Sequence, residues 1–140
     1  MRGIDSNIIL YALNQDLPEH IECKNLLKKI ANGIETISIP SIVFMESYHA
    51  LVRAYKFNEL EVKRRLITII DSENINVLAI SVSTILLAFE IAEEYITGGR
   101  DSLIAASLLE NKINEIYSHD SDFDKIKSIK RIDPVKDNLN

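Results

Sequence analysis

Short apolar runs alternate with longer stretches of helical periodicity along the whole chain. In residues 19–31, apolar positions recur at helical spacing. Residues 36–39 instead alternate between polar and apolar, as a short strand does, and Pro40 is expected to end that strand. The pattern predicts helices at residues 6–13, 19–31, 41–55, 59–72, from Ser81 or Ser83 to Gly98–Gly99, and 101–109, and strands at Ile4 and at 36–39, 75–80, 115–118 and 131–132.

Two of these helices also carry expectations about a cap and a buried face. Ser41 has a side chain suited to capping and is expected to cap the helix that follows Pro40. In the helix after Ser81 or Ser83, the apolar stripe expected to face the core consists of Ile85, Ala88, Phe89 and Ala92.

The alternation of strands and helices predicts the fold class. Strands separated by helices of about ten residues or more pair in parallel through right-handed crossovers. We therefore expect an α/β fold, a three-layer α/β/α sandwich with a central, mainly parallel sheet. No repeat and no linker rich in Gly, Pro and Ser interrupts the chain, so residues 1–140 are expected to form one domain.

Composition narrows the classes of protein to consider. The chain is 46% hydrophobic and 26% charged, which is typical of a soluble folded protein. No apolar run approaches the ~20 residues of a membrane span, and Met1 to Ser6 show no secretory signal pattern. Cys23 is the only cysteine, which excludes a disulfide or a cysteine metal site within the chain. We therefore expect a cytoplasmic protein with no membrane partner.

The net charge of −5 argues weakly against nucleic-acid binding, because such proteins usually carry a basic surplus. The distribution of charge weakens that argument, since basic residues gather in three clusters. These are Lys24, Lys28 and Lys29; Lys63, Arg64 and Arg65; and Lys125, Lys127, Lys130 and Arg131. Each cluster is either a contact surface for an anionic partner or an ordinary solvated helix face.

Three aspartates lie where a predicted strand ends or a predicted helix begins. Asp5 follows the first strand, and Asp120 follows the strand at residues 115–118. Asp101 begins a helix whose apolar stripe would point its side chain towards the edge of the sheet. In parallel α/β sheets, functional groups gather at the carboxyl ends of the strands. Helix capping and Asx turns are the competing, purely structural explanations for all three.

Glu46 differs from these aspartates because it lies within a predicted helix on an apolar stripe with Val43, Ala50 and Ala54. An ionised carboxylate is costly to desolvate, so a glutamate on a buried stripe needs a partner. That partner is either a neighbouring base, for example Arg53, or a shared functional site.

Carboxylates that share one site repel one another and need a counter-charge. Mg²⁺ or Mn²⁺ suits such a site, since both are hard cations that prefer carboxylate oxygens. One or two such ions also support displacement at a phosphodiester. The sequence has no phosphate-binding glycine loop and no zinc motif, and His20, His49 and His119 are scattered and are interpreted as ordinary residues.

Four blocks of the sequence resemble, in order, the motifs of the PIN-domain family of nucleases, and in particular its small single-domain VapC-type toxin ribonucleases. The blocks are residues 4–11, with an Asp-x-Asn; 39–46, which end in a helical Glu; 100–106, with Asp-x-Leu-Ile-Ala-Ala; and 118–123, with Ser-x-Asp-x-Asp-Phe. The resemblance covers essentially the whole chain. No block is specific alone, and the order and spacing of all four carry the signal.

The resemblance implies an Mg²⁺- or Mn²⁺-dependent endoribonuclease that cleaves RNA phosphodiester bonds with a metal-activated water. The residues it assigns to metal binding and catalysis are Asp5, Asp101 and Asp120, Glu46 directly or through water, and Asp122 as a secondary ligand. Asn7 and Ser118 would orient carboxylates or water by hydrogen bonding. The family further implies a homodimer, basic clusters that hold the RNA backbone and, for a type II toxin, a cognate antitoxin that plugs the acidic cleft.

Other functions remain open at this point. An RNA-processing PIN nuclease that is not a toxin would have the same residues, and a non-catalytic RNA- or protein-binding module would keep the fold. An aspartate-based phosphatase with Asp5 as nucleophile usually has a second aspartate two residues later, where this chain has Asn7.

Overall fold

The computed structural model describes residues 1–137 and contains a five-stranded sheet and six α-helices in that part of the chain. The strands are β1 (Arg2–Ile4), β2 (Ile37–Pro40), β3 (Ile75–Leu78), β4 (Glu115–Tyr117) and β5 (Lys130–Ile132). The helices are α1 (Ser6–Leu13), α2 (His20–Ala31), α3 (Ser41–His49), α4 (Glu59–Ile70), α5 (Val82–Tyr95) and α6 (Gly99–Glu110). A π-helical segment (Ala50–Ala54) extends α3, and a 3₁₀ helix (Ser121–Lys125) follows β4.

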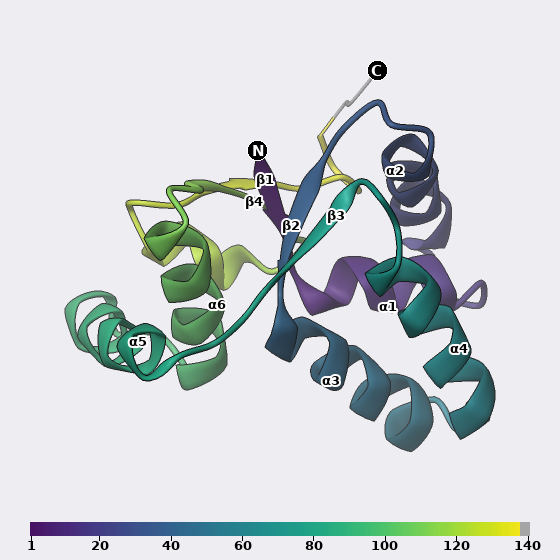
Figure 1. Cartoon of the computed structure of the whole chain (residues 1–140), viewed down its shortest axis with the longest axis horizontal. Helices are drawn as coiled ribbons and strands as arrows, with labels where there is room; N and C mark the ends of the chain where they lie inside the picture. The colour runs from purple at the N-terminus through teal and green to yellow at the C-terminus, as the bar shows by residue number, and fades with distance from the viewer. Residues whose placement is uncertain (138–140) are drawn as a thin grey trace.

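All strand pairs are parallel, in the order β3-β2-β1-β4-β5. Figure 1 shows α1, α2 and α4 on one side of the sheet and α5 and α6 on the other. The chain moves outward from β1 to β2 and β3, and then crosses back to place β4 on the other side of β1. The predicted α/β/α sandwich is therefore confirmed, and its topological switch point lies between β1 and β4.

The predicted elements are all present, with boundaries shifted by a few residues. The strand predicted at 75–80 ends at Leu78, and the helix predicted at 59–72 ends at Ile70. Residues 138–140, the end of the predicted domain, lie outside the described residues. No helix within residues 1–137 is long and apolar enough to cross a membrane.

The prediction that Ser41 caps a helix was wrong. Pro40 occupies the N-cap position, no side chain caps this helix, and Ser41 is its first residue. The helix predicted to run to residue 55 changes at Ala50 into the π-helical segment, whose wider turn ends at Ala54.

The predicted buried face of α5 was wrong for Ile85 and Phe89, whereas Ala88 is buried as predicted. The residues of α5 that are buried are Thr84, Ala88 and Ile91, whereas Ile85 is 41% exposed and Phe89 is 66% exposed. The physical reason is that α5 packs mainly on α6 and stands away from the sheet (Figure 1). The helix ends at Tyr95, before Gly98, because Ile96 adopts the left-handed conformation with φ of 53°.

The middle of the sheet packs closely against α6. Ile4 and Ile116, on neighbouring strands, are fully buried, as is Leu108 of α6. Gly3 of β1 faces Leu108, and a Cβ placed on Gly3 would lie 2.5 Å from Leu108 Cδ2. A side chain at position 3 would therefore push α6 away from β1.

We expect Gly3→Ala to lower the free energy of unfolding by about 1–3 kcal/mol, because the added Cβ would clash with Leu108, which is fully buried in a packed core. Urea denaturation followed by circular dichroism measures the change. Gly99→Ala is the matched control, since a Cβ at Gly99 meets no atom within 4 Å. Equal stability of Gly3→Ala and the wild type would show that β1 and α6 are not closely packed.

Candidate metal centre

Asp5 lies directly after β1, where the parallel pairing of Ile4 with Tyr117 brings it beside Ser118. The side chain is buried, with 5% of its surface exposed. Its Oδ1 accepts a hydrogen bond from the backbone N–H of Ser6 at 2.7 Å, and its Oδ2 accepts one from Ser118 Oγ at 2.8 Å. Asp5 therefore caps α1, as the helix-capping explanation predicted. It also lies at the topological switch point of the sheet.

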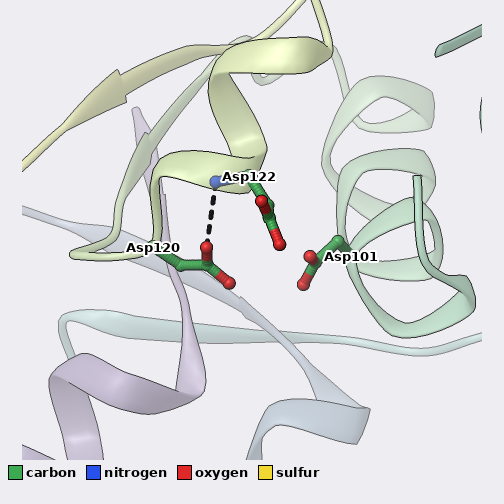
Figure 2. A group of neighbouring side chains, drawn as sticks. All are labelled: Asp101, Asp120 and Asp122. Atoms are coloured by element: carbon green, nitrogen blue, oxygen red, sulfur yellow. Dashed lines mark hydrogen bonds between the residues drawn. The ribbon is translucent and has the colours of Figure 1, made fainter. Parts of the chain in front are cut away.

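Asp120 and Asp122 come from the 3₁₀ helix that follows β4. Asp120 caps this helix by accepting a hydrogen bond at Oδ1 from the backbone N–H of Asp122, at 2.9 Å (Figure 2). The backbone N–H of Asp120 donates to Ser118 Oγ at 3.0 Å. Ser118 thus connects Asp5 and Asp120 through one hydroxyl group.

Asp101 reaches the same place from the first turn of α6. Figure 2 shows its carboxylate directed towards those of Asp120 and Asp122. One carboxylate oxygen from each of these three residues lies within 4.8 Å of the other two. The helix begins at Gly99, two residues before the predicted start at Asp101, and Gly98 is its N-cap, so the competing explanation that Asp101 caps this helix does not hold.

Glu46 enters from α3, and only 10% of its side chain is exposed. Its Oε2 pairs with Arg100 Nε at 2.8 Å, and its Oε1 is buried without a hydrogen-bond partner. Arg53, the partner suggested from the sequence, was wrong, because the base paired with Glu46 is Arg100 of α6, while Arg53 lies in the π-helical segment. Of the apolar residues predicted to share a buried stripe with Glu46, Val43 is buried but Ala54 is exposed.

These side chains share one cavity of about 410 Å³ at the carboxyl ends of β1 and β4. The predicted site residues that line it are Asp5, Asn7, Glu46, Asp101 and Asp120. Ser118 lies behind the wall as a hydrogen-bond donor to Asp5, and Asp122 lies beside the cavity, near Asp101 and Asp120. Among the residues that line the cavity, Arg100 is the one Lys or Arg side chain.

Burial and mutual repulsion raise the proton affinity of this cluster. Burial, opposed by the hydrogen bond from Ser118, raises the pKa of Asp5 to about 6. Burial, together with the negative charges of Asp120 and Asp5, raises the pKa of Asp101 to about 6. Burial also raises the pKa of Glu46, and the charge of Arg100 opposes that change. Near neutral pH, Asp5 and Asp101 are therefore mainly ionised at an energetic cost.

The donor set fits a hard divalent cation. Four carboxylates line the cavity against the single guanidinium of Arg100, so negative charge is in excess. The buried and unpartnered Oε1 of Glu46 is a polar atom whose desolvation is not compensated within the chain. Mg²⁺ and Mn²⁺ prefer such oxygen ligands, whereas a soft metal would need several cysteine or histidine ligands, and the lining of this cavity holds one histidine, His119, and no cysteine.

Sequence reasoning missed a pair of residues beside the cavity. His119, interpreted as ordinary, lines the cavity, and its Nδ1 lies 2.8 Å from Asp133 Oδ2. Its backbone N–H donates to Asn7 Oδ1 at 3.4 Å. Burial alone would raise the pKa of Asp133, but hydrogen bonds from His119 and Val135 lower it below its usual range. The only sequence signal was the position of His119 between Ser118 and Asp120.

The three basic clusters are placed differently. Lys24 and Lys28 of α2 and Arg65 of α4 line a second cavity, of about 770 Å³, and α1 contributes residues to both cavities. In the third cluster, Arg131 pairs with Asp124 at 2.9 Å and Lys125 with Asp122 at 3.5 Å. The third cluster is therefore partly neutralised by acids of the same chain.

The fold and the cavity together define an α/β/α protein with an acidic pocket at the topological switch point of a parallel sheet. The chain belongs to the PIN domain family, which matches residues 4–129. This family was the one that the sequence motifs resembled, and the resemblance is confirmed. No curated protein matches the sequence.

Solved structures share this fold at low sequence identity. VapBC2 from Rickettsia felis, bound to a promoter DNA fragment, is 19% identical with a TM-score of 0.70, covering 94% of this chain and 96% of that chain. VapC20 from Mycobacterium tuberculosis, a toxin that cleaves the sarcin-ricin loop, is 17% identical with a TM-score of 0.74, covering 89% and 93%. A toxin-antitoxin complex from Klebsiella pneumoniae is 20% identical with a TM-score of 0.66, covering 96% and 98%. At these identities, the likeness establishes the fold.

We expect the stability of the metal-free protein to fall as the pH rises from about 5 to about 7. The pKa values of Asp5 and Asp101 rise from 3.8 to about 6 on folding, so in this range the folded state holds more protons than the unfolded state. Asp101→Asn should reduce this fall, and at pH 7.5 it should stabilise the metal-free protein by on the order of 1 kcal/mol. Urea denaturation with a chelator present measures both effects.

Asp71→Asn is the control for this measurement, because Asp71 is exposed at the end of α4, away from the cavity. It should follow the wild type at every pH. If Asp101→Asn is less stable than the wild type at pH 7.5, repulsion within the cluster does not dominate at Asp101.

Proposed function

We propose that this chain is a divalent-cation-dependent endoribonuclease, the toxin of a type II toxin–antitoxin pair. The observation that supports the activity is the convergence of Asp5, Glu46, Asp101 and Asp120, from four separate segments, on one cavity. Their number, and the buried Oε1 of Glu46 without a partner, exceed what helix capping explains. Membership of the PIN domain family supports the same reaction class.

Asp5, Asp101 and Asp120 would hold Mg²⁺ or Mn²⁺, with Glu46 joining directly or through water and Asp122 as the secondary ligand. A cation bound there supplies a water of lowered pKa and neutralises charge on phosphoryl oxygens. The reaction is the hydrolysis of an RNA phosphodiester by in-line attack of water.

The task of the chain is to hold its acids in place while they are ionised. Ser118 and the N–H of Ser6 fix both oxygens of Asp5, and the N–H of Asp122 fixes Asp120. These contacts limit how far the carboxylates can turn away from one another. Preorganisation of this kind lowers the reorganisation needed when charge develops at the phosphate.

The second cavity, lined by Lys24, Lys28 and Arg65, is the proposed path for the RNA backbone, although Arg65 pairs with Glu61 in the same cavity. It adjoins the acidic cavity across α1, so a strand held there would run close to the carboxylates. The net charge of −5 is compatible with this path, because four of the acidic residues line the cavity, and the rest of the surface is less negative than the total suggests.

The biological part of the proposal concerns a cognate antitoxin, a homodimer and a cytoplasmic location. Structures of toxin–antitoxin complexes from Rickettsia felis and Klebsiella pneumoniae share the fold over most of this chain, which supports an antitoxin partner. Val82, Leu86 and Phe89 of α5 are 73%, 57% and 66% exposed, and such an apolar face is suited to a homodimer contact.

The experiment that tests the activity is cleavage of a mixed pool of transfer, ribosomal and messenger RNA. We expect discrete cuts with Mn²⁺ or Mg²⁺, no cuts with a chelator, and a loss of at least about 100-fold in Asp101→Asn. Asp71→Asn, purified in the same way, is the matched control and should cleave like the wild type, because Asp71 is remote from the cavity.

Cuts that persist in Asp101→Asn would remove Asp101 from the proposed site or reveal a contaminating nuclease. Absence of cuts under every condition, despite cation-dependent RNA binding, would favour the non-catalytic binding module.

Growth on expression separates a toxin from an RNA-processing nuclease. We expect induction of the wild-type chain in a bacterial host to stop growth, and induction of Asp101→Asn at the same protein level to leave growth unchanged. Normal growth with a wild-type protein that is active in vitro would support the RNA-processing alternative.

A further inference from the structure

Arg100 holds an unusual position at the mouth of the acidic cavity. It is the second residue of α6, next to Asp101, and its Nε lies 2.8 Å from Glu46 Oε2. Glu46 is 10% exposed and Arg100 is 73% exposed, so the pair joins a buried acid to a base that remains largely in solvent.

This ion pair satisfies only part of Glu46. The Oε1 atom remains buried and without a partner, although the guanidinium lies beside the other oxygen of the same carboxylate. Ion pairs with one solvated partner stabilise a fold only weakly. A clamp between α3 and α6 would therefore contribute little to stability, and it would leave the carboxylate half satisfied.

A divalent cation held by Asp5, Asp101 and Asp120 would compete with Arg100 for Glu46. Two positive charges that share one carboxylate repel each other, and the small divalent ion interacts more strongly with oxygen than a guanidinium does. Arg100 would then be released from Glu46. Its backbone stays in the first turn of α6, so the released guanidinium remains at the cavity mouth.

We propose that Arg100 is a substrate-binding residue: it pairs with Glu46 when no cation is bound and transfers to an RNA phosphate when the cation takes Glu46. A guanidinium binds phosphate through parallel hydrogen bonds, and this geometry is not available to lysine. The part of this inference that concerns binding of an RNA phosphate rests on the proposed ribonuclease function. The competition for Glu46 is independent of cleavage.

The first measurement is Mn²⁺ binding by titration calorimetry, without RNA, for wild type, Arg100→Gln, Arg100→Lys and Arg53→Gln. We expect Arg100→Gln to bind Mn²⁺ about 3- to 10-fold more tightly, because the competing charge is gone. Arg100→Lys should stay close to the wild type. Arg53→Gln is the matched control, since it removes an exposed arginine that does not line the cavity.

The second measurement is binding of a single-stranded RNA oligonucleotide by fluorescence anisotropy, in Ca²⁺ and in chelator, with the RNA checked by gel afterwards. In Ca²⁺, Arg100→Gln should bind about 10-fold more weakly and reduce the salt slope by about 1. In chelator, Arg100→Gln and the wild type should bind alike, because Arg100 is then paired with Glu46. Arg100→Lys should restore the binding only in part.

The outcomes separate this inference from the proposed function. Unchanged or weaker Mn²⁺ binding in Arg100→Gln, with normal binding in the wild type, overturns the competition for Glu46. An equal loss of RNA binding with and without Ca²⁺ overturns the transfer and leaves an ordinary electrostatic contact. Tighter Mn²⁺ binding in Arg100→Gln with no RNA binding by the wild type would overturn the ribonuclease and the phosphate contact, and the competition alone would stand.

Discussion

Asp5, Asp101 and Asp120 repel one another across a partly buried cavity, and the surrounding structure has to keep them there. Different contacts hold each of them. Asp5 accepts hydrogen bonds from Ser118 and from the first turn of α1, and Asp120 accepts one from the N–H of Asp122. Asp101 is positioned by the packing of α6 on the sheet. None of these contacts neutralises the negative charge of the aspartates. The one guanidinium that lines the cavity, that of Arg100, forms its ion pair with Glu46. The fold therefore concentrates negative charge that a cation would relieve, which is the physical basis for proposing a metal at this site.

The sequence predicted those parts of the molecule that follow from local rules. Parallel strands place their carboxyl ends at one edge of the sheet, so the aspartates that follow the strands at Ile4 and at residues 115–118 could be expected to meet. Glu46 was found because a charged residue interrupted an apolar stripe, and Val43 is indeed buried on that stripe. The helix-capping explanation and the site explanation for Asp5 are compatible, since the carboxylate that caps α1 also lines the cavity.

What the sequence did not predict depends on contacts between distant segments. Periodicity marks Ile85 and Phe89 as apolar, but whether they are covered depends on how far α5 stands from the sheet. Arg53, about two helical turns after Glu46, was a reasonable local partner, yet the actual partner Arg100 comes from α6. Asp133, which holds His119, follows the last strand and had no motif to mark it. In each case, tertiary packing decided between residues that local rules could not separate.

The all-parallel sheet has a consequence for the order in which the protein becomes complete during its synthesis. No two of its strands are joined by a tight hairpin, so each pairing must wait for a crossover to fold. Asp5 and the hydroxyl of Ser118 that holds it are 113 positions apart. A nascent chain on the ribosome carries Asp5 and Glu46 well before Ser118 and Asp120 emerge, and until then β1 lacks its neighbour β4. The cavity is therefore assembled late, and the acidic pocket stays incomplete while the ribosome is still making the chain.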